Sequence, residues 1–242
     1  MLELLFSSRV TVVVGHFGSG KTEIAINGAV ELAGHQRSVT LVDLDVVKPY
    51  FRSRSARAFI AERGVDLIAP TGESYYADLP IILPHIRTVL RDPQRKVILD
   101  AGGDDTGARA LGSLSDAVPL DETQRLLVLN FRRPFTESVE DAVVALREIE
   151  GAARMSMTGL VSNTHLMDET TADVVIEGYR LAMAMAKQVE VPVLAVTVEE
   201  GRELDLPAGE FDCPVFLIRR TIMPLFERPR YERKVGPIFE LT

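Results

Sequence analysis

Short apolar runs alternate with longer amphipathic segments from one end of the chain to the other. The runs are rich in valine, leucine and isoleucine and lack polar alternation, which is typical of strands buried on both faces of a sheet. We expect strands at Val10 to Val14, Val39 to Val42, Asp66 to Ala69, Val97 to Leu99, Leu126 to Asn130, Gly159 to Ser162, Val193 to Val196 and Val215 to Ile218.

The segments between these runs carry apolar residues at the spacing of a helix with one buried side. We expect helices at Glu23 to Ala33, Ser53 to Arg63, Leu79 to Arg91, Thr136 to Ala153 and Thr171 to Val189. Regular alternation of strands and helices predicts the α/β fold class, with a doubly wound, mostly parallel sheet and helices on both faces. Glycine and proline fall between the elements and nothing in the composition marks a linker, so we expect one domain over residues 1–242.

The connection after the first predicted strand, Gly15 to Thr22, matches the phosphate-binding pattern G-x-x-x-x-G-K-[ST]. Glycines let the backbone N–H groups of such a loop face phosphate oxygens, and the helix that follows adds the positive end of its dipole. The Lys21 ammonium can reach the outer phosphates, and the Thr22 hydroxyl can bind Mg²⁺. A tight turn with an accidental lysine is the alternative. We predict that a nucleoside triphosphate contacts Gly18, Ser19, Gly20, Lys21 and Thr22.

Aspartates end two of the predicted strands, at the edge where ligands bind in parallel sheets. Asp43 and Asp45 follow the second strand with one residue between them, so both side chains can point to the same region. A helix cap or a turn is the alternative for this pair. Asp100 closes the fourth strand in the Walker B pattern of a carboxylate that holds Mg²⁺ directly or through water. We predict a magnesium site at this edge, formed by Thr22, Asp43, Asp45 and Asp100.

Asn163 follows the sixth predicted strand, where its amide can both donate to and accept from the rim of a purine base. GTP-binding proteins usually show N-K-x-D there, with the aspartate holding guanine, and here Leu166 takes that place. We therefore expect ATP. A turn residue that bonds to nearby backbone is the alternative for Asn163. His165 has no paired cysteine or carboxylate in the sequence, which favours a loop role over catalysis.

Charge and cysteine content narrow the class of protein. A net charge of −8 argues against a sequence-independent nucleic-acid binder. The lone cysteine, Cys213, excludes an intrachain disulfide and a C-x-x-C metal site, and it fits a reducing compartment. Residues Met1 to Phe6 lack the basic leader of a signal peptide, and no apolar run approaches the roughly 20 residues that span a bilayer. We expect a cytoplasmic protein that is not inserted in a membrane.

This set of motifs resembles the MinD/ParA-like branch of P-loop NTPases, the CobQ/CobB/MinD/ParA nucleotide-binding domains of the SIMIBI class. The resemblance covers nearly the whole chain and is strongest from Arg9 to Asp45 and from Lys96 to Gly103. It implies ATP and Mg²⁺ as ligands and Lys21 and Asp45 as the catalytic residues. In detail, Lys21 would contact the phosphates, Thr22 and Asp100 would ligate Mg²⁺, Asp43 would support the metal shell, Asp45 would position or activate water, and Asn163 would read adenine.

Two positions depart from the pattern of that family. Its members often carry a signature lysine near the start of the loop that reaches the partner's nucleotide in a dimer, but here His16 stands in that place and Phe17 follows where glycine is usual. The resemblance thus implies a homodimer without this intersubunit lysine. Members that hold metal clusters need paired cysteines, and membrane-placing members end in a basic amphipathic helix, which Gly236-Pro237 would break here.

Three functions are compatible with these residues. The first is a slow ATPase switch that acts on an unidentified protein partner. The second is an ATP-dependent small-molecule kinase or ligase of the dethiobiotin-synthetase type, with an acceptor pocket near Asp45, Arg52 and the segment Gly72 to Tyr76. The third is a nucleotide-sensing module that hardly hydrolyses anything.

Arginines gather in two places along the chain. They are Arg52, Arg54 and Arg57 after the second predicted strand, and Arg132 and Arg133 after the fifth. Either group could balance negative charge in a transition state or bind an acidic ligand. Solvated faces and surface ion pairs are the commoner explanation for such residues.

Overall fold

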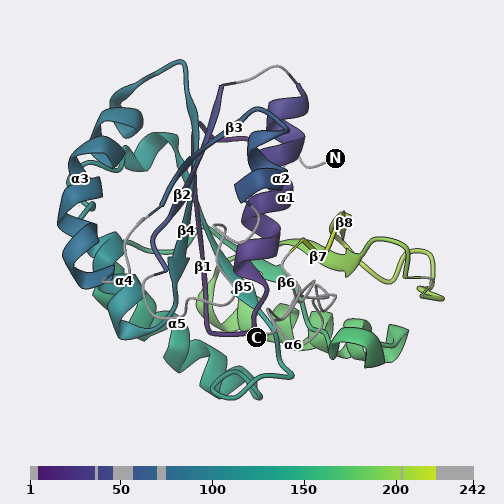
Figure 1. Ribbon diagram of the computed structural model, residues 1–242. Helices are drawn as coiled ribbons and strands as arrows, with labels where there is room; N and C mark the ends of the chain where they lie inside the picture. Colours follow the sequence, from purple (N-terminus) through teal and green to yellow (C-terminus); the bar gives the residue numbers. More distant parts are fainter. Residues whose placement is uncertain (1–4, 36–37, 46–56, 70–74, 203, 222–242) are drawn as a thin grey trace, which may run out of the picture.

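The computed structural model describes residues 5–35, 38–45, 57–69, 75–202 and 204–221, with the backbone alone for residues 75–82. The strands are β1 (Val10–Gly15), β2 (Val39–Asp43), β3 (Val65–Ile68), β4 (Lys96–Gly102), β5 (Thr123–Leu129), β6 (Gly159–Ser162), β7 (Val193–Glu199) and β8 (Val215–Ile218). The helices are α1 (Lys21–Gly34), α2 (Arg57–Ala61), α3 (Tyr75–Arg91), α4 (Asp105–Gly112), α5 (Val139–Ala153) and α6 (Ala172–Val189). The strands form one parallel sheet in the order β3-β2-β4-β1-β5-β6-β7-β8 (Figure 1).

All the predicted strands are confirmed, but some of their ends differ from the prediction. β4 continues to Gly102, so Asp100 lies inside this strand and not after it. The reason is that β4 pairs with β2 on one side and with β1 on the other, which extends the ladder past Asp100. β5 ends at Leu129, so Asn130 belongs to the turn that follows.

The predicted helices are confirmed with shifted ends, and one helix was not predicted. α5 begins at Val139 and not at Thr136, because the Ser138 hydroxyl accepts the N–H of Asp141 and caps the helix there. α2 is shorter than predicted, and residues 53–56 of that prediction lie outside the described residues. The unpredicted helix is α4, which Asp104 caps by accepting the N–H of Gly107 at 2.8 Å.

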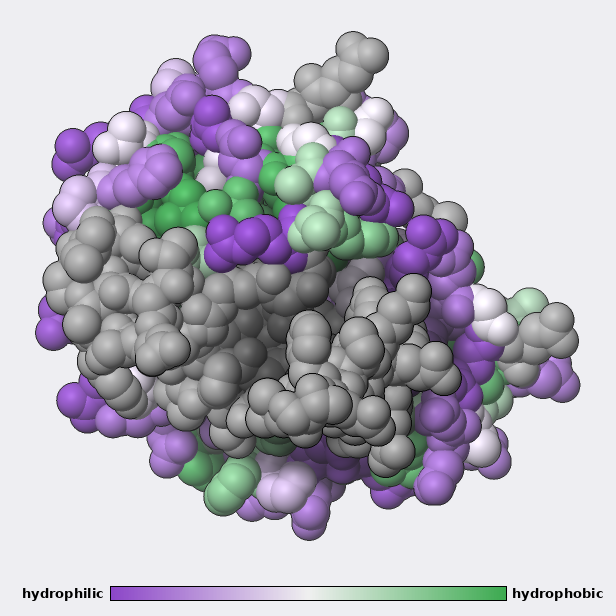
Figure 2. Space-filling model, viewed as in Figure 1, coloured by the Kyte–Doolittle hydropathy of each residue, from purple (hydrophilic) through white to green (hydrophobic). Residues whose placement is uncertain are grey.

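The helices cover both faces of the sheet, which confirms the predicted three-layer, doubly wound architecture. α1 and α2 pack on one face, and α3, α4, α5 and α6 on the other (Figure 1). Side chains alternate between the two cores: Val13 packs on the α1 side, and Val12 and Val14 on the opposite side. Because both cores are apolar, most strand residues are apolar on either face. Hydrophilic residues predominate around the described rim of the face in Figure 2.

The carboxyl ends of parallel strands meet at one edge of a sheet, and the strand order decides which of their loops are neighbours. β1, which leads into the phosphate loop, lies between β4 and β5. Asp43 is in register with Asp100 on β4, and Asp100 is in register with Val13 on β1. The sheet therefore brings the loop and the aspartates together. None of the helices in the described part of the chain combines the length and apolarity needed to cross a bilayer.

Candidate functional site

The loop between β1 and α1 has the backbone conformation that its glycines were expected to permit. Gly18 has a φ of 79° and Gly20 a φ of 88°, in the left-handed region that side chains disfavour. The N–H of Ser19 donates to the carbonyl of His16 at 3.1 Å and closes the turn. A side chain at Gly20 would also collide with Asn163, since its Cβ would lie 2.1 Å from the amide nitrogen. The chain therefore requires glycine here.

Two asparagines hold the carbonyls of this loop. The side-chain amide of Asn163 donates to the carbonyl of Ser19 at 2.6 Å, and that of Asn130 donates to the carbonyl of Gly18 at 3.2 Å. In a trans peptide the C=O and the next N–H point in opposite directions, so fixing the Ser19 carbonyl outward turns the N–H of Gly20 the other way. The asparagines thus keep the loop in the shape that a phosphate-binding nest needs.

The bonds of Asn163 bear on its predicted contact with adenine. Its side-chain oxygen accepts from the Thr197 hydroxyl at 2.6 Å, and only 4% of the residue is exposed. One N–H and one acceptor position of the amide remain for a ligand. The contact of Asn163 with the base stays a prediction, while its bond to the loop is a role in its own right.

Lys21 begins α1 and lies among the predicted carboxylates. Its ammonium is 2.7 Å from Oδ2 of Asp45, and only 7% of the residue is exposed. Burial lowers the pKa of Lys21, but the charge of Asp45, followed by those of Asp100 and Asp43, outweighs this effect and raises the pKa above its usual value. Lys21 is therefore fully charged at neutral pH.

Asp100 is completely buried. Burial raises its pKa to about 7; Lys21 opposes this effect, and the charges of Asp43 and Asp45 add to it. The Thr22 hydroxyl weakly favours the charged form. Neither oxygen of the Asp100 carboxylate meets the geometry of a hydrogen bond to any described group. A buried carboxylate whose oxygens lack hydrogen bonds of good geometry is costly, which is typical of a group kept for a ligand.

The arrangement fits an ion that takes most of its ligands from water and phosphate. No group of three or more His, Cys, Asp or Glu side chains within the described ranges is placed to hold a metal by itself. Mg²⁺ commonly binds one or two protein oxygens and fills its other positions with water and substrate phosphates. The Thr22 hydroxyl and the unbonded Asp100 carboxylate suit that pattern. The metal-binding roles of Thr22, Asp43, Asp45 and Asp100 stay a prediction.

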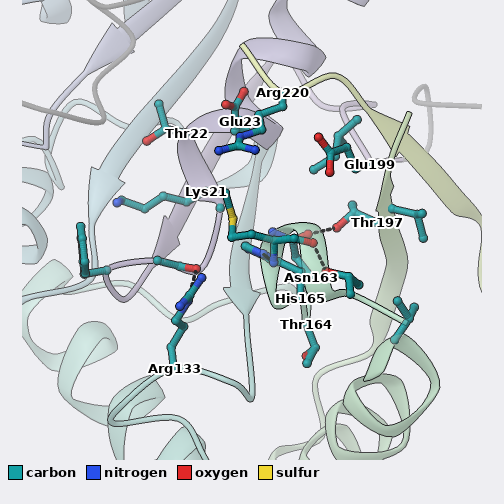
Figure 3. A pocket seen from close by; sticks show the side chains of 18 of the residues that line it. Lys21, Thr22, Glu23, Arg133, Asn163, Thr164, His165, Thr197, Glu199 and Arg220 are labelled. Atoms are coloured by element: carbon teal, nitrogen blue, oxygen red, sulfur yellow. Dashed lines mark hydrogen bonds between the residues drawn. The ribbon is translucent and has the colours of Figure 1, made fainter. Parts of the chain in front are cut away.

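A cavity of about 510 Å³ extends from the loop to the ends of β6, β7 and β8. Lys21 and Thr22 lie at one end, with Thr164, His165, Thr197 and Glu199 at the other (Figure 3). Burial lowers the pKa of His165 to about 4, with the charges of Arg133, Arg220 and Arg202 acting in the same direction. His165 is therefore neutral, and it accepts the N–H of Met167 at 3.4 Å. The loop role that the sequence favoured for His165 agrees with this geometry.

Some predicted residues lie away from this cavity or outside the described residues. The ring of His16 stacks on Phe135 with 6.0 Å between ring centroids, at the rim of the phosphate loop. Arg57 is exposed at the start of α2. Arg52, Arg54 and residues 72–74, which belong to the acceptor-pocket hypothesis, lie outside the described residues. Tyr75 and Tyr76 open α3, with their backbone alone described.

Asn130 and Thr197 are residues of this site that the sequence analysis did not name as candidates, and Arg133 was named only together with Arg132. Each acts through contacts between strands that are far apart in the chain, and none belongs to a short motif. The only available signal was position: each lies at or near the carboxyl end of a strand, at the edge where ligands bind.

Comparison with known proteins places the fold. No family model and no curated protein matches the sequence. Cell division protein FtsY from Thermotoga maritima matches with a TM-score of 0.52 and 21% identity over 78% of this chain and 61% of that one. Chloroplast FtsY from Physcomitrella patens matches with a TM-score of 0.55 and 18% identity, over 79% of this chain and 59% of that one. The signal recognition particle receptor FtsY from Elizabethkingia anophelis matches with a TM-score of 0.50 and 20% identity, over 83% of this chain and 61% of that one.

The chain spans about three fifths of the length of these FtsY proteins. At such low identity the likeness concerns the fold alone. The chain has the fold of SIMIBI-class P-loop NTPases, as its motifs indicated.

Replacing Asn163 by alanine tests its bond to the loop. The change leaves the Ser19 carbonyl and the Thr197 hydroxyl without a partner, which should lower the free energy of unfolding by about 1–3 kcal/mol. Nucleotide affinity should fall about tenfold, because the loop loses its shape. Urea unfolding and calorimetric titration measure the two effects.

Asn27→Ala is the matched control for this prediction. The Asn27 amide bonds to the backbone of Arg219 at 2.8 and 2.9 Å, and neither of these residues lines the cavity. Asn27→Ala should lower the free energy of unfolding by a similar amount and leave nucleotide affinity unchanged. Equal nucleotide affinity in Asn163→Ala and the wild type would contradict a role for Asn163 in shaping the loop.

Proposed function

We propose that this chain is a Mg²⁺-dependent ATP-binding protein that hydrolyses ATP slowly and acts as a nucleotide switch on a protein partner. The observation that carries the proposal is the phosphate loop with a buried, charged lysine. Lys21 faces Asp45 at 2.7 Å, close to a buried carboxylate that has no hydrogen-bond partner among the described groups. Such a set of charges is expensive to bury and suits a ligand that brings both phosphate and a cation.

The ion pair between Lys21 and Asp45 supplies a physical basis for switching. A bound triphosphate offers the ammonium negative oxygens and repels the Asp45 carboxylate, so the pair should separate when ATP binds. Asp45 is then available to orient the water that attacks the γ-phosphorus, with release of ADP and phosphate. The segment after β2 would thereby adopt different arrangements with and without ATP, which is the difference a partner can recognise.

The cavity beyond the loop is proposed as the site of the base. It lies next to Asn163, and its far wall is formed by the ends of β6, β7 and β8. We infer adenine because Leu166 stands where guanine-binding proteins place the aspartate that holds the base. A homodimer in which a second subunit covers the nucleotide belongs to the same proposal, as does an unidentified client protein.

Titration calorimetry with magnesium present tests the proposed function. We expect ATP to bind at least about tenfold more tightly than GTP, and chelation of Mg²⁺ to weaken ATP binding by a similar factor. Phosphate release should be slow without a partner. Absence of binding for both nucleotides would contradict the proposal, and tighter binding of GTP would contradict the choice of base. A metabolite that raises ADP release far above the basal rate would instead favour the kinase or ligase hypothesis.

A further inference from the structure

Two adjacent arginines follow β5, and their side chains have different surroundings. Arg132 is exposed and pairs with Glu177 of α6. Arg133 is partly buried and lines the cavity, and its Nε donates to the carbonyl of Gly18 at 3.4 Å (Figure 3). Within the described residues no carboxylate lies within ion-pair distance of the Arg133 guanidinium. One arginine is thus neutralised at the surface, whereas the other brings positive charge to the loop.

A tight turn fixes the position of Arg133. The side chain of Asn130 accepts the N–H of Arg132 at 3.0 Å and donates to the carbonyl of Gly18 at 3.2 Å. The Thr136 hydroxyl donates to the carbonyl of Asn130 at 2.8 Å and closes the turn from the other side. The turn is therefore bonded directly to the phosphate loop, and the arginine that it carries is held at a defined distance from that loop.

The absence of a side chain at Gly18 lets the arginine lie against the loop. A Cβ at Gly18 would come within 3.0 Å of both Cδ and Nε of Arg133. The Arg133 side chain therefore lies directly against the loop backbone, and it also lines the cavity. The charge of Arg133 also acts on His165 inside the cavity, where it lowers the pKa of His165 more than any other charged group does.

The order of the strands shows which part of a nucleotide Arg133 would meet. Asp45 follows β2 and Asp100 lies near the carboxyl end of β4, and the cavity proposed for the base lies beyond β6 and β7. A nucleotide that spans these two regions places its outer phosphate near β4 and its base near β6. β5 lies between them, so a side chain from its carboxyl end faces the middle of the nucleotide, where the α- and β-phosphates lie.

We propose that Arg133 binds the inner phosphates of the nucleotide, the α- and β-phosphates that ATP and ADP share. This inference rests on the proposed function, since it assumes a nucleotide in this cavity. An arginine without a carboxylate partner, held against a phosphate loop by its neighbour's turn, is suited to charge-assisted and bidentate bonds with phosphate oxygens. Arg133 would then support nucleotide binding before and after hydrolysis alike, unlike residues that face the γ-phosphate.

Titration of ATP and ADP into Arg133→Ala, Arg133→Lys and Arg132→Ala proteins, with magnesium present, tests the inference. Arg133→Ala should weaken the binding of ATP and of ADP by a similar factor, about 10- to 100-fold. Arg133→Lys should recover part of the loss, because it keeps the charge without the fork of donors. Arg132→Ala should bind both nucleotides as the wild type does.

Three results would overturn the inference. Unchanged affinities in Arg133→Ala would show that no phosphate is bound there. A loss confined to ATP would move the contact to the γ-phosphate. An equal loss in Arg132→Ala would reduce the effect to general surface charge. The proposed function fails separately, if the wild-type protein itself binds neither ATP nor ADP.

Discussion

Replacing Lys21 by alanine should lower the affinity for ATP by at least about 100-fold and abolish hydrolysis. The ammonium is the only cation placed inside the described phosphate loop, and its removal leaves the carboxylates of Asp43, Asp45 and Asp100 facing the site. The outer phosphates of a triphosphate would then face these carboxylates without the ammonium, and Arg133 beside the loop would not replace it there. Calorimetric titration with ATP and a phosphate-release assay measure the two losses.

The folded state of this variant needs a control of its own. Removing one partner of a buried ion pair commonly costs about 3–5 kcal/mol, so Lys21→Ala could lose binding by losing stability. The double variant Lys21→Ala, Asp45→Asn removes both charges and should regain much of that stability without regaining ATP binding. Lys187→Ala, at an exposed position of α6, should change neither property. ATP hydrolysis at the wild-type rate in a folded Lys21→Ala protein would refute the assignment of the loop.

Strands of this fold could be predicted because their apolar runs are short, uninterrupted and buried on both sides. Val10 to Val14 shows this most clearly, since alternate residues enter the two cores and none needs to be polar. α4 could not be predicted in the same way, because Gly107 and Gly112 interrupt its pattern. The structure explains one of them: a Cβ at Gly107 would lie 2.4 Å from the Cα of Gly102, so the helix needs glycine to approach β4.

Some residues of the candidate site belong to a contiguous motif, whereas others are distant in the sequence and come together only in the folded protein. Residues Gly15 to Thr22 are contiguous, so the pattern identifies them together with their strand and helix. Asn130 and Thr197 are far from the loop in sequence. Asn130 bonds to the loop itself and Thr197 bonds to Asn163, and both contacts form only because β5, β6 and β7 lie on the same side of β1 in the sheet. Arg133 could be recognised as a candidate but not distinguished from Arg132, since the partner of Arg132 lies on α6.

Replacing Asp100 by asparagine should make the protein more stable at neutral and alkaline pH while it lowers ATP hydrolysis by about 100-fold or more. Burial raises the pKa of Asp100 from 3.8 to about 7, so the folded state favours the protonated carboxyl. Stability from this group is present at low pH, and it is lost as the pH rises toward the folded-state pKa and the buried group must ionise. Asparagine cannot ionise, and it therefore escapes this loss.

The pH dependence of the stability difference is the measurement that isolates this effect. Between about pH 5.5 and about pH 8, the advantage of Asp100→Asn over the wild type should grow by roughly 2 kcal/mol in urea unfolding, at 1.4 kcal/mol per pKa unit. Any constant cost of the new amide cancels in this comparison. Asp121→Asn, at an exposed position, should show no such trend.

A stability difference that does not change with pH would contradict an uncompensated buried carboxylate at Asp100. A stabilised variant that hydrolyses ATP normally would remove Asp100 from the proposed chemistry. Gain of stability together with loss of turnover is the combination expected of a carboxylate that is kept, at a cost to folding, for the ligand it serves.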